Sequence, residues 1–306
     1  MSAGYDYGNA RLAGMRSRLP DAGCLRRLGQ AAGPGEILAI LGQDPDWRSL
    51  GRPSGTAGRD GRGAADDLIE RWRAARQRGL LGCYEPPVRR LVEALVIPLD
   101  AERLVAILRR RRAGIPGAAI AGTIVPGALL DEGTLGRLAG MPTDAALLRA
   151  LGGTGLLTDD AAAALGTLAE TVDPSAAPEE RAAATEAALG AAVERARVAR
   201  ARGRGPDATA VRDLLAAEAV DRKAVAAELA AGGPAAASVV ERVLRLARWA
   251  ALDHGAHRDP LGIGTVAAYV AAVELTAVRL RAILARVAGT WREEDATRFF
   301  AGATGS

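Results

Sequence analysis

The sequence has little of what disulfide scaffolds, redox enzymes and nucleotide-binding proteins depend on. Its 306 residues include two cysteines, Cys24 and Cys83, too few for a disulfide framework or a CxxC-based zinc or redox site. The single lysine, Lys223, has no glycine-rich stretch before it, so a phosphate-binding P-loop is excluded. A chain of this length can bury about three quarters of its unfolded surface, so it needs neither disulfides nor metals to fold.

Aromatic residues and one-sided charge are also scarce. Aromatics make up 3% of the chain, and 40 basic side chains are nearly balanced by 36 acidic ones. Nucleic-acid binding usually relies on stacking aromatics and clustered positive charge, so we expect no nucleic-acid partner. The two arginine-rich runs, at 109–112 and 195–204, are interpreted as solvated charge on helix surfaces.

Long apolar runs are missing as well. The longest uncharged apolar stretch, 114–130, has 17 residues and two prolines, whereas a membrane-spanning helix needs about 20 residues. The first 21 residues carry three arginines and lack the apolar core of a signal peptide. We therefore predict a soluble, intracellular chain.

What the sequence does have is helical periodicity over nearly its whole length. Alternating runs of β-branched or aromatic residues, which strands need, are not found, so the predicted fold class is all-α. The glycine-rich stretch 51–63 is predicted to be a loop. The longer predicted helices are 64–81 (with its arginines opposite an apolar stripe), 86–112, 158–172, 178–203, 206–231, 234–253, 261–289 and 292–300, with short helices between 114 and 155.

A loose internal repeat suggests how these helices are grouped. Similar patterns, an acidic residue or threonine followed by an apolar residue four positions later, recur at 100–104, 221–225 and 276–280. Each lies late in a long predicted helix. We expect three related helical bundles, with bounds 1–113, 114–232 and 233–306.

One acidic motif has a possible chemical role. Asp66-Asp67-Leu-Ile-Glu70 has the shape of the motif with which all-α terpene synthases bind magnesium and pyrophosphate. The second metal motif and the aromatic lining of those enzymes are absent. Acidic residues in the first turn of a helix also complement its dipole. The structural role is favoured, and an isoprenoid-type enzyme is kept as an alternative.

Two other patterns match functional motifs by letters alone. His254 and His257 are three residues apart in a predicted loop, whereas a zinc pair on a helix needs a spacing of four. The segment 262–267 matches a dinucleotide fingerprint, but no strand precedes it. We therefore predict no catalytic residue, no metal and no cofactor.

Four segments together resemble one known family. The segment Tyr5–Leu12, YDYGNARL, is followed by MRSRL at Met15–Leu19, and the chain's one asparagine lies within it. This start resembles that of the central-stalk subunit of V-type and archaeal-type rotary ATPases, called C in prokaryotes and d in eukaryotes. Segments 100–114, 123–130 and 261–281 are similar to later motifs of that family. The family's asparagines are replaced at Arg103, Ala224 and Arg279.

The resemblance implies a fold and a function. Members are funnel-shaped, all-α assemblies of three similar helical bundles in a pseudo-threefold arrangement, without a catalytic site or cofactor. They lie on the cytoplasmic face of the membrane proteolipid c-ring and receive the rotor shaft, built from D- and F-type subunits. They thereby couple ATP synthesis or hydrolysis to proton or sodium transport. The expected location is cytoplasmic and peripheral on the inner face of the cell membrane. A stand-alone helical adaptor with a divergent copy of the fold is a further alternative.

The C-terminal helix is the element expected nearest the coupling interface, because it carries a family motif and lacks charge from Gly264 to Val273. Glu274 and Arg281 are two helical turns apart, too far to pair, so each should find a partner on another helix or another subunit. Reversing the charge of Arg281 is expected to weaken assembly more than folding. The candidate interface residues are Tyr269, Glu274, Arg281, Asp100 and Arg109.

Overall fold

The computed structural model describes residues 5–51, 61–171, 177–203, 205–216 and 262–290. In these segments all regular structure is helical and no strand occurs, which confirms the predicted all-α class. The predicted helices 234–253 and 292–300, together with His254 and His257, lie outside the described residues. The helix expected from 206 is described as far as 216.

The chain forms two compact units. Unit 1 is discontinuous and combines residues 1–88 with residues 203–306, whereas unit 2 is the continuous stretch 89–202. The expected division into bundles 1–113, 114–232 and 233–306 stays a prediction, because most of its third bundle lies outside the described residues.

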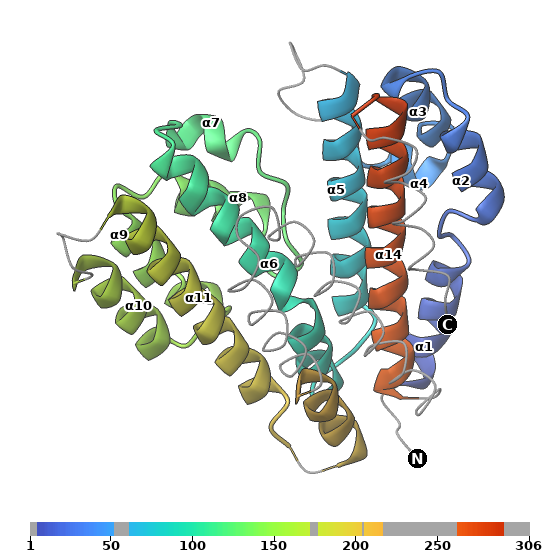
Figure 1. The fold of residues 1–306 in the computed structure, drawn as a ribbon. Helices are drawn as coiled ribbons and strands as arrows, with labels where there is room; N and C mark the ends of the chain where they lie inside the picture. Colours follow the sequence, from blue (N-terminus) through green and yellow to red (C-terminus); the bar gives the residue numbers. More distant parts are fainter. Residues whose placement is uncertain (1–4, 52–60, 172–176, 204, 217–261, 291–306) are drawn as a thin grey trace, which may run out of the picture. The chain divides into compact units, whose positions relative to one another are not determined.

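Unit 1 is built around two long helices that lie side by side (Figure 1). These are α5, which begins within the glycine-rich stretch predicted to be a loop, and α14, which confirms the predicted C-terminal helix. Short helices α1, α2 and α3 pack on α14, and α3 also contacts α5. The bounds are α1 (Asp6–Arg16), α2 (Ala22–Gly29), α3 (Pro34–Leu41), α4 (Pro45–Arg48), α5 (Gly61–Leu81) and α14 (Ile263–Val287).

Local sequence signals set where the short helices begin. The Asp21 carboxylate accepts a hydrogen bond of 2.6 Å from the backbone N–H of Cys24 at the start of α2. Asp44 does the same for Asp46 in α4, at 2.8 Å. Pro34 and Pro45 occupy the first position of α3 and α4, where the missing N–H of proline has no intrahelical partner to lose.

Helix α14 is the core element of unit 1. Of the 22 residues from Ile263 to Leu284, 17 are buried. By length and composition it could also cross a membrane, with a mean hydropathy of 1.5 in its most apolar window, but 78% of that window is buried inside the protein. A helix that is apolar on all sides and enclosed by its neighbours is typical of a protein core.

Unit 2 contains helices α6 to α11. Leucines and isoleucines of α6, such as Leu104 and Ile107, form one core with residues of the short helices and with Leu189 and Val193 of α11. The short helices confirm those expected between 114 and 155. The bounds are α6 (Val88–Arg112), α7 (Gly117–Ala121), α8 (Glu132–Ala139), α9 (Asp144–Arg149), a 3-10 turn at Gly152–Thr154, α10 (Asp159–Thr171) and α11 (Pro178–Arg200).

Candidate functional site

The five candidate interface residues lie in two different units. Tyr269, Glu274 and Arg281 belong to α14 in unit 1, whereas Asp100 and Arg109 belong to α6 in unit 2. Each group is therefore described within its own unit.

Glu274 and Arg281 both bind side chains of α5. Glu274 Oε1 accepts hydrogen bonds from Arg73 Nε at 2.8 Å and from Gln77 Nε2 at 2.5 Å. Arg281 Nε donates to Asp66 Oδ1 at 2.8 Å, and its Nη2 donates to Glu70. The expectation that each would find a partner on another helix is confirmed, and that helix is α5 in both cases.

These contacts form a continuous polar network along the seam between α5 and α14. On α5 its members are spaced by four, three and four residues, so they line one face of the helix. Arg73 Nη1 also approaches Glu70 Oε1 at 3.3 Å, which joins the two halves of the network. The network consists of Asp66, Glu70, Arg73, Gln77, Glu274 and Arg281.

Most of this α5–α14 network is buried. Glu70, Arg73 and Glu274 are each less than 7% exposed, so their charges depend on one another for solvation. Burial lowers the pKa of Arg281, but the carboxylates of Glu70 and Asp66 raise it, and the net shift is upward. The guanidinium of Arg281 therefore stays charged and holds the two carboxylates in place.

The network corrects two expectations. Arginines of α5 were expected opposite its apolar stripe, but Arg73 is buried in the seam. Asp66 is not in the first turn, because α5 already begins at Gly61. Its contact with Arg281, rather than the helix dipole, gives this carboxylate its structural role.

The same contacts bear on the magnesium hypothesis. Asp66 and Glu70, one helical turn apart, both face the guanidinium of Arg281, which a metal ion would have to displace. Within the described segments, no group of three or more histidine, cysteine, aspartate or glutamate side chains is arranged to hold a metal.

Tyr269 lies in a second cluster on the same pair of helices. Its side chain is fully buried, and burial raises the pKa of its hydroxyl to about 12, against an opposing effect of Arg76. Arg76 pairs with Asp46 of α4 at 2.5 Å and lies 5.9 Å above the ring of Trp72. The stacked rings of Trp47 and Trp72, 5.0 Å apart, complete the link between α4 and α5. This cluster was not predicted, because no spacing in the sequence relates its members.

Asp100 lies at the centre of a tight contact in unit 2. Its fully buried carboxylate accepts hydrogen bonds from the backbone N–H of Leu129 at 3.1 Å and of Leu130 at 2.8 Å. Gly127 packs so closely that a Cβ added there would lie 1.9 Å from Asp100 Oδ1. Burial raises the pKa of Asp100 to about 6, although the backbone donors oppose this shift.

Arg109 belongs to an ion-pair cluster at the C-terminal end of α6. Arg109 and Arg112 bind Glu186 of α11 at 2.7 and 3.0 Å. Arg111 and Arg112 bind Asp144 of α9 at 3.3 and 3.0 Å. The interpretation of run 109–112 as solvated charge therefore holds only in part, because the Arg109 side chain is 70% exposed whereas that of Arg111 is 14% exposed and bound to Asp144.

The second arginine run also contains structural residues. Arg197 is 1% exposed and donates from Nε to the carbonyl oxygen of Ala94 at 2.8 Å. Arg200 binds Glu93 at 3.4 Å. Both residues attach α11 to α6, so here too the prediction of solvated charge holds only in part, while Arg195 is exposed as expected.

The N-terminal motif makes its own contact within unit 1. Tyr84 Oη donates a hydrogen bond of 2.8 Å to Asn9 Oδ1. Arg11 Nη1 donates to the carbonyl oxygen of Gly82 at 3.2 Å. These bonds attach α1 to the segment that follows α5.

No protein-family model matches the chain, and no curated protein has detectable sequence similarity to it. The resemblance to the rotary ATPase subunit therefore depends on the four sequence segments alone. The described polar side chains of these segments join helices and loops to one another.

Proposed function

We propose that the chain is a non-catalytic central-stalk subunit of a V-type or archaeal-type rotary ATPase. The observation that carries this proposal is the contact of Asp100 with Gly127, Leu129 and Leu130. It joins two of the segments on which the resemblance rests, separated in sequence by a stretch with no motif of its own. A chance match in letters gives no reason for a fully buried carboxylate to fit against the glycine of the second segment.

The other two segments support the proposal in the same way. Asn9 of the first segment accepts a bond from Tyr84, and Glu274 and Arg281 of the last one are bound by α5. A coupling subunit transmits torque, so its long helices have to resist sliding past one another. Charged hydrogen bonds fix the register of α5 and α14 because they are directional, unlike apolar contacts.

The partners of such a subunit are the D- and F-type shaft subunits and the proteolipid c-ring. The chain is then peripheral on the cytoplasmic face of the membrane and couples ATP turnover to proton or sodium transport. The funnel of three bundles with pseudo-threefold symmetry is part of this proposal. The isoprenoid-enzyme alternative is less favoured, because Arg281 already forms ion pairs with Asp66 and Glu70.

Affinity purification from detergent-solubilised membranes of the source organism tests the proposal. The tagged chain should capture the proteolipid ring and both shaft subunits, identified by mass spectrometry. Arg109→Ala should lower this capture without lowering the melting temperature, because the side chain is exposed and Glu186 keeps Arg112. Arg90→Ala, an exposed arginine on the same helix, is the matched control.

Capture of neither partner by the unmodified chain would contradict the coupling role and leave the helical adaptor. Magnesium-dependent pyrophosphate release from a prenyl pyrophosphate, abolished in Asp67→Ala, would instead establish the enzyme alternative.

A further inference from the structure

We propose that the exposed surface of α1, α2 and the turn that connects them binds an anionic membrane surface. This inference does not rest on the proposed function. The surface, called the basic face below, consists of Arg11, Arg16, Arg18, Arg26 and Arg27.

The basic face concentrates positive charge in a short stretch. All five arginines are exposed, and all fall between residues 11 and 27. The one acidic residue in that stretch, Asp21, uses its carboxylate to cap α2. Clusters of four to eight basic residues on an amphipathic helical segment are typical of sites for anionic lipid headgroups.

The arginines of the basic face meet few carboxylates. In the described part of the chain, four of the five make no ion pair, and Arg18 approaches Asp46 at 3.9 Å, the limit of an ion pair. By contrast, the described ion pairs elsewhere engage arginines of α5, α6, α9, α11 and α14. The positive potential of the basic face is therefore not cancelled locally.

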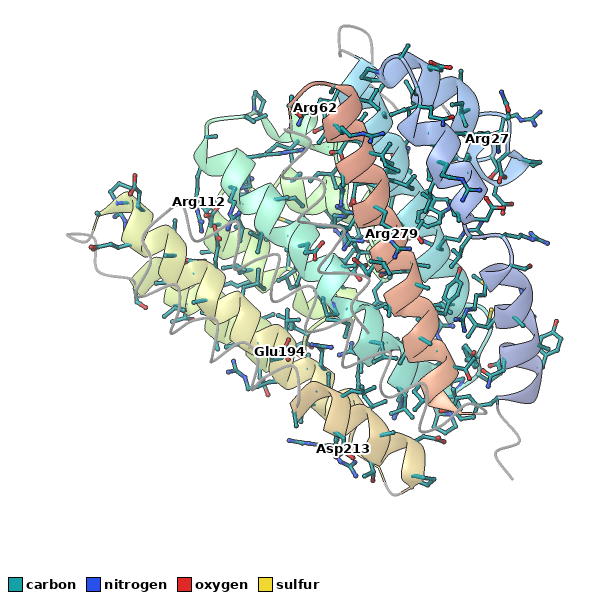
Figure 2. All side chains as sticks on the ribbon, turned by 45° about the vertical axis from the view of Figure 1, so that its right-hand side comes forward. Arg27, Arg62, Arg112, Glu194, Asp213 and Arg279 are labelled. Atoms are coloured by element: carbon teal, nitrogen blue, oxygen red, sulfur yellow. The ribbon has the colours of Figure 1, made fainter. Side chains whose placement is uncertain are left out.

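The two helices hold this charge at the surface of unit 1. Their apolar residues, including Leu12 and Leu28, are buried, and both helices pack on α14. Figures 1 and 2 show α1 and α2 on the same side of α14, with Arg27 labelled on α2 in Figure 2. The arginines therefore lie on the exposed sides of the two helices, away from the core of unit 1.

An exposed tyrosine completes the basic face. Tyr7 is 73% exposed, and the guanidinium of Arg11 lies 5.7 Å from the centre of its ring. Tyrosine and arginine are both suited to the headgroup region of a bilayer, where an apolar ring meets polar surroundings.

A membrane fits this surface better than a protein partner does. Apart from Asp21, the exposed positions between the arginines are small residues, Ala13, Gly14, Ser17 and Ala22. A stable protein interface needs a buried apolar centre, which these residues do not provide. Attraction to anionic lipids needs exposed positive charge, which the basic face offers.

Vesicle sedimentation with the full-length chain tests the proposal. The probe is vesicles of equal parts phosphatidylcholine and phosphatidylglycerol, compared with vesicles of phosphatidylcholine alone. We expect binding to the anionic vesicles that weakens as salt is added, because salt screens exposed charges. The triple variant Arg16→Ser, Arg26→Ser, Arg27→Ser should bind on the order of a hundredfold more weakly, since each basic residue near such a surface contributes about a fivefold factor.

The matched control removes the same charge from elsewhere, in Arg90→Ser, Arg137→Ser, Arg195→Ser, three exposed arginines of unit 2. This variant should bind the anionic vesicles within a few fold of the unmodified chain. Equal loss in both triple variants would show that net charge alone is responsible and would overturn the proposal. So would equal binding to the two kinds of vesicle. Binding to poly-glutamate but not to vesicles, through the same three arginines, would identify an acidic protein as the partner and likewise refute the lipid surface.

Discussion

At the scale of the residue, Asp100 makes the stability of the chain depend on pH. Burial raises its pKa from 3.8 in the unfolded chain to about 6 in the folded one, so the folded chain holds the proton more tightly. Asp100 therefore favours folding most at low pH, and that contribution is lost as the pH rises from about 4 to about 6.

We expect the free energy of unfolding to gain on the order of 1 kcal/mol from this residue when the pH falls from 7 to 5. Asp100→Asn keeps an acceptor oxygen for Leu129 or Leu130 but removes the titration. Urea denaturation of both proteins at the two pH values gives the pH dependence of each free energy of unfolding. The difference between the two dependences is the contribution of Asp100, because the other titrating groups contribute equally to both proteins. An identical pH dependence in the two proteins would show that Asp100 titrates normally.

Gly127 is the second residue whose role can be measured directly. In Gly127→Ala the new methyl group would overlap the Asp100 carboxylate, since its Cβ would lie 1.9 Å from Oδ1 and 2.7 Å from Cγ. The loop has to shift and lose hydrogen bonds, so we expect the free energy of unfolding to fall by about 1–3 kcal/mol.

Gly136→Ala is the matched control for that substitution. Gly136 lies within α8, and a Cβ there would meet its nearest neighbour at an ordinary 3.7 Å. Because alanine favours the helix, this variant should be more stable by roughly 0.5–1 kcal/mol. Thermal or urea denaturation measures the change in the free energy of unfolding for each variant. A change of the same sign in both variants would contradict the proposed fit at Gly127.

At the scale of the element, much of the fold could be predicted from periodicity. The ends of α14 and α10 fall within two residues of the predicted ones, because glycine, proline and polar caps interrupt the apolar pattern. The pairing of α5 with α14 could not be predicted, since about 200 residues separate them and apolar stripes do not specify a partner. Likewise, Arg73 and Gln77 are of residue types usually found at the surface. Their burial could not be predicted without knowing that Glu274 of α14 lies opposite them.

The contacts of Arg281 with α5 change what a mutation there should do. Its carboxylate partners lie within unit 1, so loss of the guanidinium should weaken folding itself rather than assembly alone. In Arg281→Met we expect the free energy of unfolding to fall by about 2 kcal/mol, less than the 3–5 kcal/mol of a fully buried pair because Arg281 is partly exposed.

Arg279→Met is the control for Arg281, because Arg279 lies two residues away on α14 and makes no ion pair within the described residues. That change should shift the free energy of unfolding by no more than about 0.5 kcal/mol. If urea denaturation gives the same loss for both variants, apolar packing rather than the polar network accounts for the effect.

At the scale of the whole molecule, the two units differ in how the chain builds them. Unit 2 is one continuous stretch whose core joins α6 to α11. Both partners of each contact in this core therefore belong to the same stretch of chain. Unit 1 depends on both ends of the chain, because α14 is the element against which α1, α2, α3 and α5 pack.

This difference predicts that residues 88–202 fold alone, whereas residues 1–88 do not. The isolated 88–202 fragment should give a helical far-UV circular dichroism spectrum and a cooperative melting transition, because every member of its apolar core lies within the fragment. The 1–88 fragment lacks α14, so the apolar stripe of α5 is uncovered and Arg73 loses Glu274. It should aggregate or melt without cooperativity, and co-expression with residues 203–306 should restore a soluble, cooperative pair. A cooperative 1–88 fragment, or an unfolded 88–202 fragment, would show that the two units do not fold as the contacts indicate.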